Sequence, residues 1–245
     1  MDHLLRATAH AEARHFWFRG FRAFMTPLVE TAVRGRQNPR ILDCGCGTGA
    51  NVEWLNRFGR SWGFDRSPVG LRFGREAGRS RLVRATVTAA PFASESFDLV
   101  TSFDVLYSLE EPDERAAIGE MFRLTRPGGF VLINVAAMDV LRGDHSVLSQ
   151  EVRRYSRSDL QRLVAGAGFT TVRLTYTNIA LFLPLAGLRM IQRWRGLEAR
   201  PREISVPAAP INALLTALLR LESRWLRHFD GPFGSSLICL ARKPA

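Results

Sequence analysis

The residues with the clearest chemical potential are an acid and three glycines at alternate positions, Asp43, Gly45, Gly47 and Gly49. Glycine tolerates positive φ and lets a ligand come up against bare backbone. The apolar residues just before them predict the end of a buried strand, and a helical spacing of apolar residues follows at 51–58. A glycine turn from strand to helix, at the first crossover of an α/β sheet, is a nucleotide-binding position.

The spacing of these glycines favours one kind of cofactor. A dinucleotide fingerprint is G-x-G-x-x-G, with the pyrophosphate at the helix N-terminus. This chain has G-x-G-x-G, preceded by an acid. A carboxylate suits a cationic amine better than a pyrophosphate, so the pattern indicates S-adenosylmethionine (SAM), whose methionine end carries an ammonium. A nicotinamide dinucleotide and a purely structural turn are the alternatives.

A second acid, Asp65, ends the next predicted strand, residues 60–65, and a later strand is predicted at residues 97–103. An acid at the end of this strand can accept hydrogen bonds from both hydroxyls of a ribose. Ser67 and Pro68 then begin a helix, as N-cap and first helical residue. Two acids at these two places are a stronger signal than the glycines alone.

Residues 43–49 resemble the first motif, D-x-G-x-G-x-G, of class I SAM-dependent methyltransferases, and the chain is similar to their methyltransferase type 11-like family. Asp98-Leu99-Val100 and Arg126-Pro127-Gly128-Gly129 also match, and the resemblance runs from about residue 12 to residue 243. It implies a cofactor site formed by the glycine turn and the strand ends that follow: Asp43, Gly45, Cys46, Gly47, Gly49, Asp65, Arg66, Thr86, Val87 and Phe103.

One of these positions departs from the family pattern. The family places an Asp that binds the adenine amino group five residues before a Pro-Phe pair, here Pro91-Phe92, and this chain has Thr86 there. Threonine can still form a hydrogen bond, but it brings no charge to the adenine contact.

Aromatic residues are dense before the first strand, in residues 12–24, where Trp17 and Phe18 stand next to each other. One interpretation is an amphipathic helix that packs on the edge of the domain. The other is a lid over the cofactor, because aromatic faces attract a sulfonium and exclude water. In that interpretation Trp17 and Phe18 contact the cofactor.

Two further residues are candidates for the methyl-transfer step. Alignment of the nucleophile supplies much of the acceleration, and a base is needed only when the nucleophile starts protonated. The loop 138–154 offers Asp144 and His145, and His145 is the candidate base because an unperturbed histidine titrates near about 6.5. A solvated loop residue is the alternative for His145. Tyr107 either positions the acceptor or packs.

The elements that must position these residues form an α/β fold. The resemblance implies a doubly wound, Rossmann-like sheet of seven strands, mostly parallel with an antiparallel last strand, and with helices on both faces. We expect an N-terminal helical lid at residues 1–39, the SAM-binding core at 40–178, a helical insertion or cap at 179–232, and the last strand at 233–245.

The insertion carries the least usual pattern of the chain. An apolar stretch at 179–191 runs into an arginine-rich one that ends at 202, and a helix follows at 211–229. Its predicted apolar face holds Ile211, Leu215, Leu218, Trp225 and Phe229, with arginines opposite. Glu222 falls within the apolar face, where a carboxylate needs a partner; an ion pair with an inward arginine is favoured over a role in the substrate pocket. Two arrangements stay open: a closed cap with both apolar faces against the core, which we favour, and an interfacial position on anionic lipid.

Composition limits the partners. The net charge is +11, and Lys243 is the only lysine among 34 basic residues. A basic balance suits nucleic acid, an anionic membrane or an acidic substrate, and no recognised nucleic-acid motif is present. Three scattered cysteines without a Cys/His cluster predict no metal site and a reducing, cytoplasmic location. No signal-peptide core or membrane-length apolar run is found, so membrane contact would be peripheral.

We therefore expect an enzyme that moves a methyl group from SAM to an oxygen or nitrogen of a small-molecule or lipid-linked acceptor with an apolar portion. No nucleic-acid partner is expected, peripheral contact with an anionic membrane is an option, and the oligomeric state is left open. A non-catalytic SAM-fold binding protein and an NAD-linked oxidoreductase are the alternatives.

Overall fold

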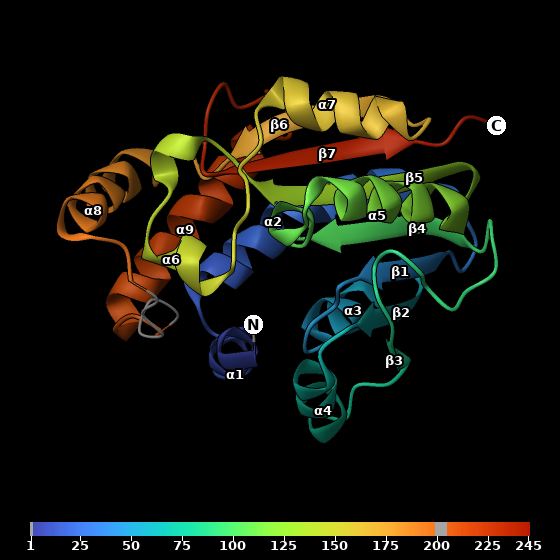
Figure 1. Ribbon diagram of the computed structural model, residues 1–245, viewed down its shortest axis with the longest axis horizontal. Coiled ribbons are helices and arrows are strands. Elements are labelled where there is room, and N and C mark those ends of the chain that lie inside the picture. The colour runs from blue at the N-terminus through green and yellow to red at the C-terminus, as the bar shows by residue number, and fades with distance from the viewer. Residues whose placement is uncertain (1, 199–204) are drawn as a thin grey trace.

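The computed structural model describes residues 2–198 and 205–245. Its centre is a seven-stranded sheet with the order β3-β2-β1-β4-β5-β7-β6 (Figure 1). The strands are β1 (Arg40–Cys44), β2 (Arg60–Asp65), β3 (Leu82–Arg84), β4 (Phe97–Phe103), β5 (Thr125–Ala136), β6 (Thr170–Thr177) and β7 (Ser236–Arg242). The first five are parallel, while β7 runs antiparallel between β5 and β6. The expected fold class is confirmed.

Helices cover both faces of this sheet, and each face has its own apolar core. They are α1 (Asp2–Ala11), α2 (Phe16–Val33), α3 (Ala50–Leu55), α4 (Pro68–Glu76), α5 (Glu111–Leu124), α6 (Asp144–Leu148), α7 (Arg157–Gly166), α8 (Phe182–Arg195) and α9 (Ala209–Trp225), with short 3-10 turns η1 (Leu106–Ser108) and η2 (Asp139–Leu141). In Figure 1, α5 and α7 lie in front of the sheet and α2 runs behind it. One core joins the sheet to α5 and α7, and the other joins it to α2, α3 and α9.

Several predicted boundaries agree with the structure. The strands at 60–65 and 97–103 have the predicted limits. Ser67 caps α4, and Ser156 caps α7 in a capping box with Asp159. The N-terminal segment is divided, because α1 and the start of α2 border the cavity described below, whereas Phe24 and Met25 of α2 are buried in the core.

The insertion between β6 and β7 forms α8 and α9. The face of α9 that packs on α2 is largely polar: Asn212 Oδ1 accepts from Phe16 N (2.8 Å), and Ser223 Oγ donates to Ala23 O (2.7 Å). The predicted apolar face is instead turned outward, with Ile211 and Phe229 more than half exposed. The favoured closed cap, with both apolar faces against the core, is therefore wrong for α9. The polar side chains of α9 pair with backbone groups of α2. If these side chains faced solvent instead, those backbone groups would be buried without partners.

The predicted partner of Glu222 is also wrong. Its carboxylate oxygens accept hydrogen bonds from Ile179 N (2.9 Å) and Ala180 N (3.0 Å), just before α8 begins. Backbone N–H groups at a helix start carry partial positive charge and need acceptors. Glu222 therefore joins α9 to the start of α8 and does not need an inward arginine.

None of the described helices is long and apolar enough to cross a membrane.

Candidate cofactor and acceptor site

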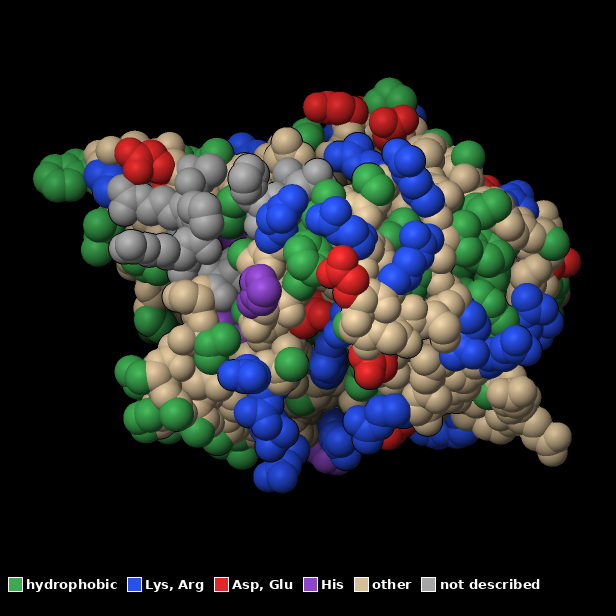
Figure 2. Space-filling view, turned by 90° about the horizontal axis from the view of Figure 1, so that it is seen from below, with side chains coloured by type: hydrophobic (Ala, Val, Ile, Leu, Met, Phe, Trp, Pro, Cys, Tyr) green, Lys and Arg blue, Asp and Glu red, His purple; other side chains and the backbone are tan. Residues whose placement is uncertain are grey.

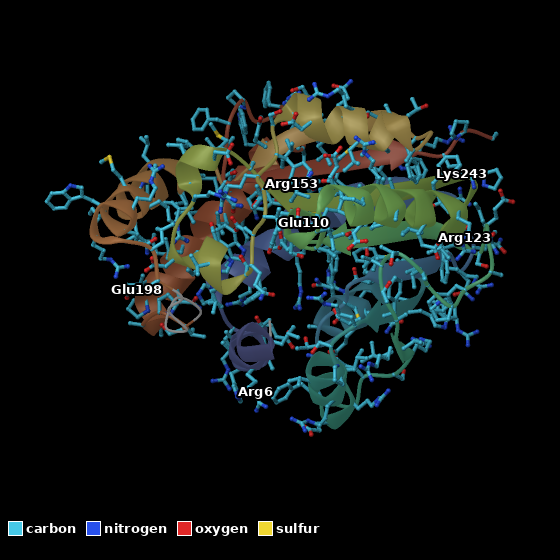
Figure 3. All side chains as sticks on the ribbon, in the orientation of Figure 1. Arg6, Glu110, Arg123, Arg153, Glu198 and Lys243 are labelled. Atoms are coloured by element: carbon cyan, nitrogen blue, oxygen red, sulfur yellow. The ribbon has the colours of Figure 1, made fainter. Side chains whose placement is uncertain are left out.

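A cavity of about 670 Å³ lies at the carboxyl ends of the parallel strands. Residues of α1 and α2 border it on one side, and residues of α8 border it on another. Its volume is within the range of pockets that bury a cofactor-sized ligand, and the carboxyl edge of a doubly wound sheet is where such ligands bind. Figure 3 shows the two ends of the molecule: Glu198, after α8, lies near one end, and Arg123 and Lys243 lie near the other.

The glycine turn forms one wall of the cavity. Gly45, Gly47 and Gly49 have φ values of 78°, 55° and 77°, the left-handed region that favours glycine. The backbone N–H groups of Gly45 and Cys46 both donate to Phe64 O (2.9 Å), which fixes the turn to the end of β2. A Cβ on Gly45 would overlap Cγ2 of Val105. Gly45 and Gly47 line the cavity, whereas Gly49 lies behind them.

Replacing Gly45 by alanine is expected to weaken SAM binding at least tenfold, because both the φ strain and the overlap with Val105 distort the turn. Gly78→Ala is the matched control, since Gly78 has a φ of 76° and nothing within 4 Å of the added Cβ. It should cost about 1 kcal/mol of stability and leave the affinity unchanged. Calorimetric titration of both variants with SAM measures this. Equal SAM affinities in the two variants would contradict the assignment of the glycine turn to the cofactor site.

Asp65 stands beside this turn and lines the cavity. Its Oδ2 accepts from Gly47 N and its Oδ1 accepts from Ser67 N, both at 2.8 Å. Each carboxylate oxygen can accept more than one hydrogen bond. Asp65 therefore holds the glycine turn and still has capacity to accept ribose hydroxyls.

Asp43 lies below the turn and does not line the cavity. It is only 1% exposed, and Thr101 Oγ1 donates to its Oδ1 (2.7 Å) from β4. Burial, opposed by this hydrogen bond, raises the pKa of the carboxyl to about 7. The structure thus places Asp43 directly before the glycine turn, bound to β4 and outside the cavity lining.

The raised pKa of Asp43 predicts a pH-dependent stability. Between its ordinary pKa of 3.8 and about 7, the folded chain holds a proton that the unfolded chain has released. The free energy of unfolding should therefore fall as pH rises through this window. Asp43→Asn, which is neutral throughout, should reduce that fall by about 4 kcal/mol over the whole window, measured by urea unfolding at several pH values. Glu76→Gln, at an exposed position on α4, is the control. An unchanged slope in Asp43→Asn would contradict the assignment.

The aromatic N-terminal residues reach the cavity. Trp17 and Phe18 both line it, at the start of α2. His15 caps this helix, because its Nδ1 accepts from Trp17 N (3.1 Å), and burial lowers the pKa of the imidazole. Glu12 anchors the preceding segment by accepting from Thr48 Oγ1 (2.6 Å) in the glycine turn.

The other predicted cofactor residues also line the cavity. They are Cys46, Arg66, Thr86, Val87 and Phe103. Burial raises the pKa of the Cys46 thiol well above its ordinary value, so Cys46 remains a neutral thiol. Among the described residues, no group of His, Cys, Asp or Glu is placed to hold a metal ion.

The structure brings both predicted catalytic residues to the cavity. Tyr107 of η1 and His145 of α6 line it. Burial raises the pKa of the Tyr107 hydroxyl well above its ordinary value, so this hydroxyl keeps its proton. Asp144 does not line the cavity. It is fully buried and accepts hydrogen bonds from Arg195 Nη2 and Glu198 N, so it fixes the end of α8.

Asp104 is a cavity residue that the sequence predictions did not include. It follows β4 directly, and its φ of 61° is a strained value of the kind found at functional sites. Asn134 of β5 holds it, since Asn134 Nδ2 donates to Asp104 Oδ1 (2.8 Å). The side chain of Asp104 is exposed, and it lines the cavity. Desolvation by the protein around it raises the pKa of the carboxyl to about 7. An acid after a parallel strand, as at Asp65, is the signal that points to it.

An apolar wall lines another part of the cavity. It is formed by the inward side of α8, from Leu181, Leu185 and Leu188. Arg189 of the same helix also lines the cavity, and its guanidinium donates to Gln192 Oε1 (2.6 Å). The cavity thus combines a nucleotide-type end, at the glycine turn, with an end that has the carboxyls of Asp104, Asp113 and Glu151 and an apolar side.

Comparison with known proteins agrees with this geometry. Residues 42–133 match a family described as a methyltransferase domain. The demethylmenaquinone methyltransferase of Renibacterium salmoninarum is 33% identical over 112 residues, which are 43% of this chain and 45% of that protein. The chain spans about half the length of the curated relatives it matches.

Two solved structures share the fold. Phosphoethanolamine N-methyltransferase 2 of Haemonchus contortus, in complex with SAM, has a TM-score of 0.58 and 16% identity over 90% of this chain and 52% of its own. The [4+2]-cyclase SpnF has a TM-score of 0.58 and 21% identity over 91% of this chain and 81% of its own.

The sheet order and the glycine turn, together with the match over residues 42–133, show that this chain contains a class I SAM-dependent methyltransferase domain. SAM is the cofactor of that class. Three features of the chain fit SAM: the bare glycine backbone, the acid beside it, and the aromatic residues over the cavity.

Proposed function

We propose that this chain transfers a methyl group from SAM to an oxygen or nitrogen of an acceptor with an apolar portion, either a small molecule or a lipid-linked one. The observation that carries the proposal is a single cavity joining the glycine turn and Asp65 to Asp104 and the leucines of α8. An acceptor held between Asp104 and α8 would meet the cofactor without crossing solvent.

The chain's own groups suit the binding of the cofactor. Asp65 accepts the ribose hydroxyls, and Trp17, Phe18 and Phe103 exclude water from the cavity. Arg22 also lines the cavity, and its Nε is buried without a hydrogen-bond partner in the described part of the chain. A carboxylate such as that of a methionine moiety would satisfy this guanidinium. SAM, when bound, supplies a methyl group on a positively charged sulfur.

Proton transfer is assigned to the acceptor end. A carboxyl with a pKa of about 7 accepts and releases protons near neutrality, so an Asp104 carboxylate oxygen suits the proton of a hydroxyl or ammonium acceptor. Tyr107 keeps its proton and donates a hydrogen bond to the acceptor. His145 is the second candidate base, because it lines the same cavity from α6.

Two titrations and one assay test the proposal. SAM and NADH are titrated by calorimetry, and binding of NADH alone would overturn it. Release of S-adenosylhomocysteine is then measured with pools of phenols, acyl thioesters and amines that carry apolar chains. The likeness to a cyclase shows that this fold is not confined to proteins named methyltransferases. SAM binding without methyl transfer to any pool would favour the second candidate, a non-catalytic SAM-binding protein.

The lid assignment has its own expected result. SAM should protect Trp17 from acrylamide quenching, because the cofactor would lie against the start of α2. Quenching is measured with and without saturating SAM, both in the parent chain and in Trp17→Phe. The difference between the two chains gives the contribution of Trp17. Quenching that SAM leaves unchanged in the parent chain would assign residues 12–24 to edge packing alone.

A further inference from the structure

Helix α8 is apolar on two opposite faces. Leu181, Leu185 and Leu188 face the cavity. Leu183 and Trp194, on the other side of the helix, are 77% and 93% exposed. Large apolar side chains that gather on an exposed surface mark an interaction site. The outward face has an apolar composition without an apolar environment among the described residues.

Helix α9 repeats this arrangement at the same end of the molecule (Figure 1). Its buried side is polar, as described above, while Leu214, Leu221 and Trp225 are turned outward at 69%, 62% and 44% exposure. Both helices lie at the same end of the molecule (Figure 1), and hydrophobic side chains gather along that end in the space-filling view (Figure 2). We call this surface the outer insertion face; its residues are Leu183, Met190, Ile191, Trp194, Leu214, Leu221, Trp225 and Phe229.

We propose that the outer insertion face docks on an anionic membrane surface. Interfacial helices lie in the plane of the membrane with leucine and tryptophan in the acyl boundary and arginine at the headgroups. Arg193 on α8, and Arg220 and Arg224 on α9, supply such exposed arginines next to the apolar residues. Tryptophan is enriched at this boundary because its ring is apolar and its N–H is polar.

Charge decides between a membrane and a second copy of the chain. The exposed acids described here, Glu198 and Asp230, are already paired with Arg195 and Arg173. A second copy would bring Arg193, Arg220 and Arg224 of one chain against those of the other, and like charges at an interface are unfavourable. An anionic membrane attracts them, at about fivefold in affinity for each arginine near the surface.

This docking deepens the proposed function. The leucines on the inner side of α8 line the cavity, so a membrane against its outer side lies one helix away from the acceptor end. A lipid-linked acceptor would then reach Asp104 along α8 while its lipid part remained in the bilayer. That consequence rests on the proposed function, but membrane binding itself does not.

Vesicle co-sedimentation of the full chain tests the docking. Phosphatidylcholine vesicles are compared with vesicles that also contain phosphatidylglycerol, at low and high salt. We expect binding that requires phosphatidylglycerol and falls as salt rises, because salt screens the arginines. Absence of binding to either vesicle at low salt overturns the inference.

Variants locate the binding surface. Leu183→Ser with Trp194→Ser should reduce vesicle affinity about tenfold or more, whereas Val172→Ser, at a half-exposed position on β6, should leave it unchanged. Arg220→Gln with Arg224→Gln should reduce it roughly twenty-five-fold. Arg115→Gln with Arg162→Gln, two exposed arginines on α5 and α7, should have much less effect. Equal losses from the two arginine pairs would overturn the assignment to this face.

Two further measurements separate the possibilities. Sedimentation equilibrium without vesicles that shows dimers, lost in Leu183→Ser with Trp194→Ser, would assign the face to a second copy instead. SAM affinity is measured on the same variants and should be unchanged, since none of these residues lines the cavity. Vesicle binding in a chain that fails to bind SAM would support the docking and overturn the proposed function.

Discussion

Asp65→Ala is expected to weaken SAM binding by about tenfold to a hundredfold, because it removes the acceptor for the ribose hydroxyls. It also removes the hydrogen bonds that Asp65 receives from Gly47 N and Ser67 N, so the glycine turn loses its support. Asp65→Asn keeps one acceptor oxygen and should lose less. Calorimetric titration with SAM measures both variants.

The control is Glu76→Ala, which removes a solvent-exposed acid from the neighbouring helix α4. Its SAM affinity should equal that of the parent chain. If Asp65→Ala folds and binds SAM as tightly as this control does, the ribose is held elsewhere and the cofactor site is misassigned.

Asp98→Ala is expected to give the largest loss of stability, about 2–4 kcal/mol in the free energy of unfolding. Asp98 is buried at the start of β4 and accepts from Arg36 Nη1 (2.6 Å), Arg126 Nη1 (3.1 Å) and Arg40 N (2.8 Å). Alanine leaves all three donors without this acceptor. The figure is below that of a fully buried pair because both arginine side chains are partly exposed.

The Asp98 cluster lies at the end of the sheet opposite the cavity, so SAM affinity at a temperature where the variant is folded should not change. Glu111→Ala removes the exposed pair with Arg115 on α5 and should cost less than about 1 kcal/mol. A urea midpoint for Asp98→Ala equal to that of Glu111→Ala would show that the cluster does not stabilise the sheet. The cluster also explains two sequence motifs, since Asp98 and Arg126 belong to the segments that resemble the methyltransferase family.

Local pattern was sufficient for the strands and for the cofactor turn. Residues 60–65 and 97–103 are bounded by turn residues and carry apolar runs, and glycine spacing with an acid indicated the cofactor class before any contact was known. These signals are local because they depend on backbone conformation and on burial of consecutive residues.

Partners distant in sequence were not accessible to such patterns. Asp43 was predicted as a cofactor ligand, and the structure pairs it with Thr101, 58 residues away. For α9, helical periodicity identified two faces but not which one is buried. That choice depends on backbone carbonyls of Arg14 and Ala23, which accept from Asn212 and Ser223. Asp104 was overlooked because Asn134, on the neighbouring strand, holds its carboxylate by a hydrogen bond.

The pairing of Thr177 with Ser236 has a consequence for the segment that lies between these two residues. These residues end β6 and begin β7, so the two ends of the insertion are held side by side in the sheet. The entropic cost of closing a loop grows only slowly with its length. The segment between them can therefore be exchanged for a longer or shorter one without shifting the register of the sheet. A change in this segment would therefore reshape the α8 wall of the cavity, while the glycine turn and Asp65, encoded before Thr177, stay in place.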